Sequence, residues 1–295
     1  MKYKSLIMPK KMYWFVVPAL ILFLTFWIIP IFSLFRYSIT NFNGINPNYD
    51  IVGLKNFETL YKQGILFNSI KNTLIYAAIL VVFGNVTALT LAMALNVKLK
   101  GKSFYRSAIY IPTLFSAIVV GFIWSYVYMP DKGMISSMMH VIGLDGSKLN
   151  ILGNFKTALY GISVVDIWKN VGSTMIIYLA GLQMVDESLL EAGKIDGCNE
   201  WQLIRLVKLP LISASITINV VLGVINGLKA FDYAFIMTNG GPGTSTNTLM
   251  FTIYKIAFTE QQFGKASAFS VAAFLVIIVI TVAMLIFMNK KEVEL

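Results

Sequence analysis

Three polar side chains lie close together in a stretch of sequence that is otherwise apolar enough to cross a membrane. Asp166, Lys169 and Asn170 are three and four residues apart, which places them on one face of a helix. About ten residues at ~1.5 Å each separate them from the start of the stretch, near the middle of a ~30 Å hydrocarbon layer. Charged groups at that depth either pair and lock helices together or line a substrate path or gate.

Two later asparagines form a second polar set. Asn219 and Asn226 are seven residues apart, so they share a helix face, and Lys229 and Asp232 extend this polarity beyond the apolar stretch. Amides inside a membrane either bond one helix to another or contact the substrate. Both interpretations stay open for these residues.

Two aromatic side chains, Trp124 and Tyr128, share a helix face near the end of another apolar stretch. Such rings are enriched where a membrane meets water, which favours a role in an aromatic belt. Aromatic rings also stack on the apolar faces of sugars, so both remain candidates for a substrate path.

Chemistry on a substrate is not indicated. One cysteine, Cys198, and one histidine, His140, exclude an internal disulfide and argue against a zinc site or a Cys/His nucleophile. The fragment Gly101-Lys102-Ser103 lacks the first glycine of a phosphate-binding loop, where Asn96 stands, and follows an apolar helix. We therefore predict no catalytic residue, no metal and no bound cofactor.

Composition places these residues in a membrane protein. Hydrophobic residues make up 57% of the 295 residues and charged residues 13%, against about 25% charged in soluble domains. So few charges exclude a disordered chain and a nucleic-acid-binding surface. The net charge of +10 fits the excess of Lys and Arg in cytoplasmic loops of membrane proteins.

Apolar runs of about 20 residues predict an all-α, polytopic fold in the lipid bilayer, with one transmembrane domain over residues 13–288. Six spans are expected, at about 13–35, 70–95, 103–128, 157–182, 209–231 and 266–288. Basic residues gather in segments 2–11, 98–106, 194–208 and 290–291, which six spans place on one side. Both tails, 1–12 and 289–295, are therefore predicted to be cytoplasmic.

The segment from 186 to 208 predicts two short helices on the cytoplasmic side. Ser188 and Glu191 have the spacing of a capping box, and so have Asn199 and Gln202. Gly197, between them, suits a helix end that needs positive φ. A buried stripe is expected at Leu203, Leu206 and Val207.

This segment resembles the EAA loop of binding-protein-dependent ABC importer permeases. The pattern reads E-A-A, three residues, G, nine residues, I-x-L-P; here it is Glu191-Ala192-Gly193, Gly197 and Val207-Lys208-Leu209-Pro210 at the same spacing. Gly193 replaces the second alanine and weakens the helix by roughly 0.5–1 kcal/mol. The strings IYIPTLFSAIVVGFIWSYVY, IWKNVGSTMIIYLAGLQ, FDYAFIMTNGGPGTSTNTL and FGKASAFS resemble the carbohydrate-uptake branch, that of the maltose and glycerol-3-phosphate importers.

The resemblance implies the permease subunit of a sugar or oligosaccharide importer in a bacterial or archaeal cell membrane. It implies a second, different but homologous permease, two ATPase subunits and an extracytoplasmic solute-binding protein as partners. It assigns ATPase coupling to Glu191, Ala192, Gly193, Asp196 and Gly197. Transport is then a two-state rearrangement driven by ATP on the partner.

Two other classes of protein would explain part of the sequence. In an ion-gradient-driven transporter, Asp166 and Lys169 would form a proton or ion relay, but no inverted repeat is visible and the EAA-like loop would have no purpose. A membrane enzyme for lipid-linked sugars would need clustered carboxylates or histidines near an interface, and the sequence shows none outside the 186–208 segment.

Overall fold

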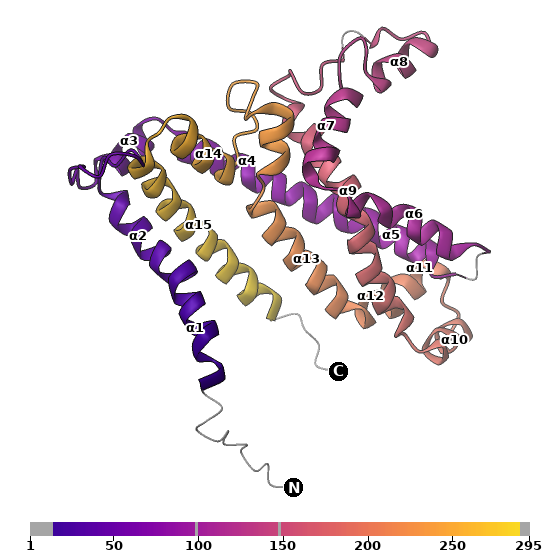
Figure 1. The fold of residues 1–295 in the computed structure, drawn as a ribbon. Coiled ribbons are helices and arrows are strands. Elements are labelled where there is room, and N and C mark those ends of the chain that lie inside the picture. Colours follow the sequence, from indigo (N-terminus) through magenta and orange to yellow (C-terminus); the bar gives the residue numbers. More distant parts are fainter. Residues whose placement is uncertain (1–13, 98–99, 147–148, 290–295) are drawn as a thin grey trace, which may run out of the picture. The chain divides into compact units, whose positions relative to one another are not determined.

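The computed structural model describes residues 14–97, 100–146 and 149–289, and within these ranges it contains helices and no β-strand (Figure 1). The predicted all-α fold class is confirmed for the described residues. The predicted tails lie outside these ranges, apart from Asn289, which is the last residue of a helix. The chain divides into two units, Met1–Gly64 with Ile253–Leu275 and Ile65–Thr252 with Val276–Leu295.

The first unit contains a long apolar helical segment, one short helix and part of the last helix. Its aromatic side chains pack together: the rings of Tyr37 and Phe42 stack at 4.7 Å, and Phe42 also meets Tyr49 and Phe263. The amide of Gly264 donates to the carbonyl of Phe42 at 2.7 Å, which ties the start of the last helix to this cluster. The elements are α1 (Val17–Phe23), η2 (Leu24–Ile28), α2 (Ile29–Ser38), α3 (Lys55–Lys62), η7 (Lys255–Thr259) and the start of α15 (Phe263–Asn289).

The second unit carries the candidate site. Its first part consists of α4 (Ile65–Ile79), η3 (Leu80–Gly84), α5 (Asn85–Leu95), α6 (Lys102–Leu114), α7 (Ala117–Val127), α8 (Met134–Val141) and α9 (Ala158–Gln183). Then follow α10 (Glu187–Ile195), α11 (Glu200–Gln202), η5 (Leu203–Lys208), α12 (Leu209–Leu211), α13 (Ser213–Leu228) and η6 (Ala234–Thr238). Helix α14 (Leu249–Tyr254) leads back to the first unit. The η segments are π-helical turns that widen the helices in which they occur.

Helix α9 is the centre of the second unit. It packs against α4, α5, α6 and α13, and its 26 residues extend about 39 Å at ~1.5 Å per residue. One core cluster surrounds its first half, with Ile162 and Val165, and another its second half, with Met175 and Tyr178. Helices α8 and α10 lie at opposite ends of this unit (Figure 1), so α9 connects its two ends.

Three helical segments of the described chain are long and apolar enough to cross a membrane: Val17–Ser38, Ile65–Leu95 and Phe263–Met284. Two bent helix pairs raise the number to five if each pair is one span. Helix α9 has the length for the predicted fourth span but is not among them, because Asp166, Lys169 and Asn170 lower its hydropathy. Length and apolarity alone therefore do not give six spans.

The predicted span at 103–128 differs from the structure, which has two helices bent by 99° there. Pro112 lies in the last turn of α6, and Phe115 is extended at φ −75° and ψ 148°. The Ser116 hydroxyl then accepts from the Val119 amide at 3.3 Å and caps a new helix, α7. Proline at a helix end and a serine cap together explain the break.

The predicted span at 209–231 is also divided. Residues 209–211 continue the helical segment Glu200–Leu211, and the chain bends by 73° before α13 begins at Ser213. Ile212 lies at this bend and is buried. Pro210 therefore lies inside the last turn of the segment that was predicted to end at residue 208, and the membrane helix begins after it.

Candidate functional site

The carboxylate of Asp166 on α9 is held by two neutral donors. The Tyr76 hydroxyl on α4 donates to Oδ2 at 2.7 Å, and the Asn170 amide donates to Oδ1 at 2.5 Å. Hydrogen bonds to a charged acceptor are stronger than those between neutral groups. This arrangement fixes the carboxylate between two helices and leaves its position well defined.

Lys169 does not form the direct pair with Asp166 that was one of its two predicted roles. Its ammonium group donates to the Thr113 carbonyl at 3.4 Å and to the Asn170 Oδ1 at 3.5 Å. The Thr113 hydroxyl in turn donates to the Lys169 carbonyl at 2.9 Å. Lys169 is thus oriented by α6, and its long contacts leave the ammonium able to bind another group.

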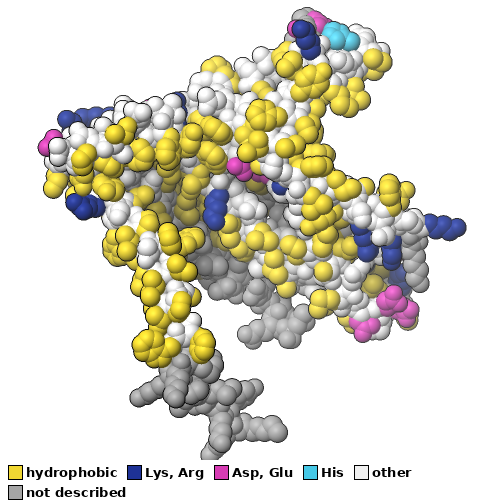
Figure 2. Space-filling model, viewed as in Figure 1, with side chains coloured by type: hydrophobic (Ala, Val, Ile, Leu, Met, Phe, Trp, Pro, Cys, Tyr) yellow, Lys and Arg dark blue, Asp and Glu magenta, His cyan; other side chains and the backbone are white. Residues whose placement is uncertain are grey.

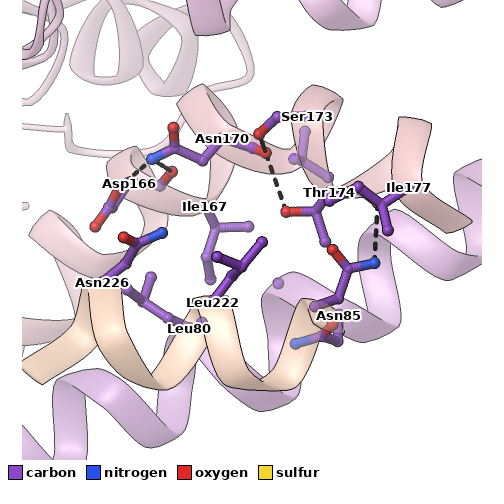
Figure 3. Close-up of a pocket in the computed structure, with 14 residues that line it drawn as sticks. Leu80, Asn85, Asp166, Ile167, Asn170, Ser173, Thr174, Ile177, Leu222 and Asn226 are labelled. Atoms are coloured by element: carbon purple, nitrogen blue, oxygen red, sulfur yellow. Dashed lines mark hydrogen bonds between the residues drawn. The ribbon is translucent and has the colours of Figure 1, made fainter. Parts of the chain in front are cut away.

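Two adjoining cavities meet at this polar cluster. One, of about 140 Å³, extends between α5, α9 and α13, with Asp166, Asn170 and Asn226 at one end and Asn85 at the other (Figure 3). The other, of about 300 Å³, is lined by Asp166, Lys169, Asn170 and Asn226, by Lys229 and Asp232, which were predicted only to extend this polarity, and by two residues that the prediction did not name, Tyr76 and Tyr233. The predicted polar residues of α9 and α13 therefore line one connected space.

The two predicted asparagines of α13 differ in their surroundings. Asn219 is 3% exposed and donates to the Thr174 carbonyl at 3.2 Å, a bond between α13 and α9. Asn226 is exposed and borders both cavities. The geometry gives Asn219 a structural bond and leaves the Asn226 amide facing the space.

The two aromatic candidates lie away from the cavities. Tyr128 is 6% exposed, and its hydroxyl donates to the Gly161 carbonyl at 3.3 Å. The Trp124 ring lies 5.2 Å from that of Tyr128 and 5.4 Å from that of Trp168. Both therefore pack α7 against α9, and neither lines the space around Asp166.

The segment after α9 forms the two predicted short helices. The Cys198 amide donates to the Gly193 carbonyl at 2.9 Å and the Gly197 amide to the Lys194 carbonyl at 3.1 Å, the paired bonds of a Schellman helix end. Gly197 has φ 84°, which an L side chain rarely adopts, so glycine is required. The prediction of a glycine helix end is confirmed.

One of the two predicted capping boxes forms. The Asn199 and Gln202 side chains accept from each other's backbone amides at 2.9 and 2.8 Å. The box at Ser188 and Glu191 was wrong: α10 begins earlier, and Asp186 caps it by accepting from the Ser188 amide at 2.9 Å. That bond lowers the pKa of the Asp186 carboxyl, and a carboxylate is favoured at a helix start by the helix dipole.

Gly193 allows the two short helices to pack closely. A Cβ at this position would lie 2.7 Å from Leu203 Cδ2, and Leu203 is buried. The predicted stripe holds for Leu203 but not for Leu206, which is exposed. Residues 203–208 form the π-helical turn η5, whose wider winding changes which side chains share a face.

The surface of residues 186–208, which we call the coupling segment after its predicted role, combines acidic and apolar side chains. Glu191, Ala192 and Asp196 are exposed, and acidic side chains gather at the end of the unit where α10 lies (Figures 1 and 2). Ile195 is 85% and Trp201 69% exposed. Two large apolar side chains are therefore exposed beside charges on this segment.

A comparison with protein families decides what kind of molecule carries these features. A family model described as "Binding-protein-dependent transport system inner membrane component" matches residues 84–290. The chain belongs to this family. It is therefore an inner-membrane permease, a transport subunit and not an enzyme, and ATP hydrolysis belongs to a separate subunit.

Relatives of this permease are similar over nearly their whole length. The probable starch degradation products transport system permease protein AmyD of Thermoanaerobacterium thermosulfurigenes is 36% identical over 284 residues, 96% of each chain. The multiple sugar-binding transport system permease protein MsmF of Streptococcus mutans is 32% identical, covering 95% of this chain and 97% of its own. A bacterial ABC transporter involved in the import of the acidic polysaccharide alginate shares the fold, with TM-score 0.83 and 24% identity over 96% of each chain.

The permease residues that sequence reasoning missed carry little local signal. Tyr76 is a single tyrosine in an apolar helix, and only the packing of α4 on α9 brings it to Asp166. Tyr233 is 4% exposed and lines the larger cavity, and its hydroxyl has no hydrogen-bond partner among the described residues. Asp232, a charged residue directly after an apolar stretch, was the sequence feature that indicated the larger cavity.

Proposed function

We propose that this permease is one of two membrane subunits of an ATP-driven importer for a sugar or oligosaccharide, and that it forms half of the pathway by alternating access. The observation that carries the proposal is the similarity over nearly the whole chain to permeases named for starch degradation products and multiple sugars. A further relative, 31% identical, is the diacetylchitobiose uptake system permease NgcF of Streptomyces coelicolor.

The cavity chemistry supports a polyhydroxylated substrate. Around Asp166, the larger cavity combines a carboxylate, two lysines, amides and tyrosine hydroxyls, which together offer both donors and acceptors. Two lysines, Lys169 and Lys229, balance two acids, Asp166 and Asp232, in its lining. A balanced, polar cavity suits neutral sugar hydroxyls better than a single ionic group.

The partners in this proposal are a second, homologous permease, two ATPase subunits that hold ATP and Mg²⁺, and an extracytoplasmic solute-binding protein. The coupling segment supports an ATPase contact, because the Gly197 and Asn199 bonds fix the junction between its two short helices while its surface exposes Ile195 and Trp201. The chain itself binds no cofactor in this mechanism.

The topology that we propose is multi-pass, in a bacterial or archaeal cell membrane, with both termini in the cytoplasm. Six crossings follow if α9, the bent pair of α6 and α7, and α13 each cross the membrane once. The basic residues in segments 98–106 and 194–208 support a cytoplasmic location for these loops.

Reconstitution tests the function directly. The permease is placed in vesicles with its candidate partner permease, ATPase and solute-binding protein, and uptake of labelled sugars is measured. We expect uptake that requires ATP and the binding protein. Uptake that runs on an ion gradient without ATP would identify a secondary transporter and overturn the proposal.

Tyr233→Phe tests the larger cavity as the substrate path. Removing a buried hydroxyl that has no partner in the described chain leaves stability unchanged or slightly higher. If the hydroxyl bonds the substrate, the substrate concentration for half-maximal uptake rises about three- to tenfold. Tyr126→Phe, on the exposed side of α7, is the matched control and should leave both quantities unchanged. Equal uptake curves for both variants would remove Tyr233 from the path.

A further inference from the structure

A basic cavity lies at the end of the second unit opposite α10. It has a volume of about 480 Å³, and its lining includes Lys71, Asn68, Lys156, Tyr160 and Ser245. None of the described residues that line it is acidic. Both lysines are exposed, so the cavity carries two positive charges that its own lining does not balance.

The same cavity offers a hydroxyl for hydrogen bonding. The Ser245 Oγ is buried and has no hydrogen-bond partner in the described part of the chain. Its loop is held in place because the Asn72 amide donates to the carbonyls of Thr244 and Asn247 at 2.8 and 3.1 Å. Two ammonium groups and a hydroxyl on a fixed loop match the oxygens of an anionic group.

An apolar groove continues from this cavity along α9. Tyr160 belongs to both the basic cavity and a second one of about 400 Å³, which is lined by Ile79, Phe83 and Val164 among others. A third cavity of about 490 Å³, which includes Leu91, adjoins the second and shares its Val164 lining. The three together form a polar end followed by a long apolar groove.

The outer wall of the groove lies on a different side of α9 from the transport cavity. At 100° per residue, Tyr160 and Val164 fall about 120 and 160° around the helix from Asp166, whereas Ile167 and Val171 line both spaces. Phe83, Tyr160 and Val164 are exposed large side chains on this face, which suits contact with lipid.

The basic cavity and the adjoining apolar cavity at Phe83 fit one leaflet of a bilayer. Leu91 in the third cavity lies twenty residues from Lys71, about 30 Å along a helix, and so beyond that leaflet. Ile79 and Phe83 follow Lys71 by eight and twelve residues in the sequence, about 12 and 18 Å along a helix. Half of a ~30 Å hydrocarbon core is about 15 Å. The groove also coincides with η3, where the π-helical turn leaves Phe83 exposed.

We propose that this groove binds an anionic phospholipid of the leaflet opposite the coupling segment. Lys71, Lys156 and Ser245 hold its phosphate-containing head group, and an acyl chain lies along Phe83 and Val164. The unbalanced lysines select an anionic head group over a zwitterionic one, because each basic group near a membrane attracts anionic lipid. The apolar continuation selects a lipid over free phosphate.

Native mass spectrometry of the assembled transporter tests this site. The complex is purified in detergent, and phosphatidylglycerol or phosphatidylcholine is added in equal amounts. We expect phosphatidylglycerol to be retained preferentially. Lys71→Gln and Lys156→Gln should each lower its retention about fivefold. Lys132→Gln, an exposed lysine outside the groove, is the matched control and should change nothing.

Further measurements distinguish a bound lipid from free phosphate and from the partner permease as the occupant of the groove. Thr87→Trp fills the apolar groove while both lysines remain, so it should also lower phosphatidylglycerol retention, and inorganic phosphate should not displace the lipid. Full retention in Thr87→Trp, or displacement by phosphate, would show a phosphate site and overturn the proposal. Cross-linking of a Phe83→Cys variant to the partner permease would assign the groove to the second subunit and would also overturn the proposal.

Discussion

Glu191→Lys is expected to lower ATP-driven uptake about a hundredfold or more while the permease still inserts and assembles with its partner permease. Glu191 lies exposed on α10 and takes part in none of the ion pairs among the described residues. Its carboxylate is therefore available to a partner subunit. Reversing a charge inside a protein interface costs about 2–5 kcal/mol, because the facing group is left buried beside a like charge.

Uptake and ATPase activity, measured on the same vesicles, check this prediction. The variant should lose the stimulation of ATPase activity by the solute-binding protein together with transport. Glu58→Lys is the matched control: it makes the same charge change on the exposed surface of α3 and should transport normally. If Glu191→Lys transports normally with intact assembly, the coupling role of α10 is disproved.

The local features of the coupling segment could be predicted from the sequence because they depend on neighbouring residues. Gly197 follows a helical run and precedes a cap, and its positive φ is the common geometry of a helix end. The Asn199 box likewise needs only a three-residue spacing. The box at Ser188 failed because Asp186 competes for the same helix start, and spacing alone does not rank two possible caps.

Long-range features could not be predicted in this way. The 99° bend after Leu114 interrupts a run of apolar residues that is long enough for one span, so hydropathy gives no sign of it. Spacing placed Asp166 and Asn170 on one face correctly, but the donor that completes the site, Tyr76, comes from 90 residues earlier in the chain. Only the packing of α4 on α9 makes that contact.

A close contact between α6 and α9 depends on a glycine that carries no sequence signal of its own. A Cβ on Gly172 would lie 2.5 Å from the Ile109 carbonyl oxygen and 2.7 Å from the Tyr110 Cα. Both are backbone atoms of α6, which cannot move aside as a flexible side chain can. Small residues at such positions allow membrane helices to approach closely.

Gly172→Ala is therefore expected to destabilise the permease by about 3 kcal/mol, since the added methyl group forces α6 away from α9. The thermal unfolding midpoint in detergent should fall by roughly 5–10 °C. Gly84→Ala is the matched control, because its Cβ would meet only Ile167 Cγ1 at 3.9 Å. That variant should keep or raise the midpoint, since alanine favours a helix by roughly 0.5–1 kcal/mol.

The same substitution connects packing with transport. Thr113 on α6 binds Lys169 through both its carbonyl and its hydroxyl, so a displaced α6 also releases the ammonium group beside the cavity. Uptake by Gly172→Ala, measured at a temperature well below its unfolding midpoint, should therefore be reduced. The unfolding midpoint of Gly84→Ala should be no lower than that of the unaltered permease. An unchanged midpoint for Gly172→Ala would mean that α6 and α9 can separate freely, and the position assigned to Lys169 would then lose its support.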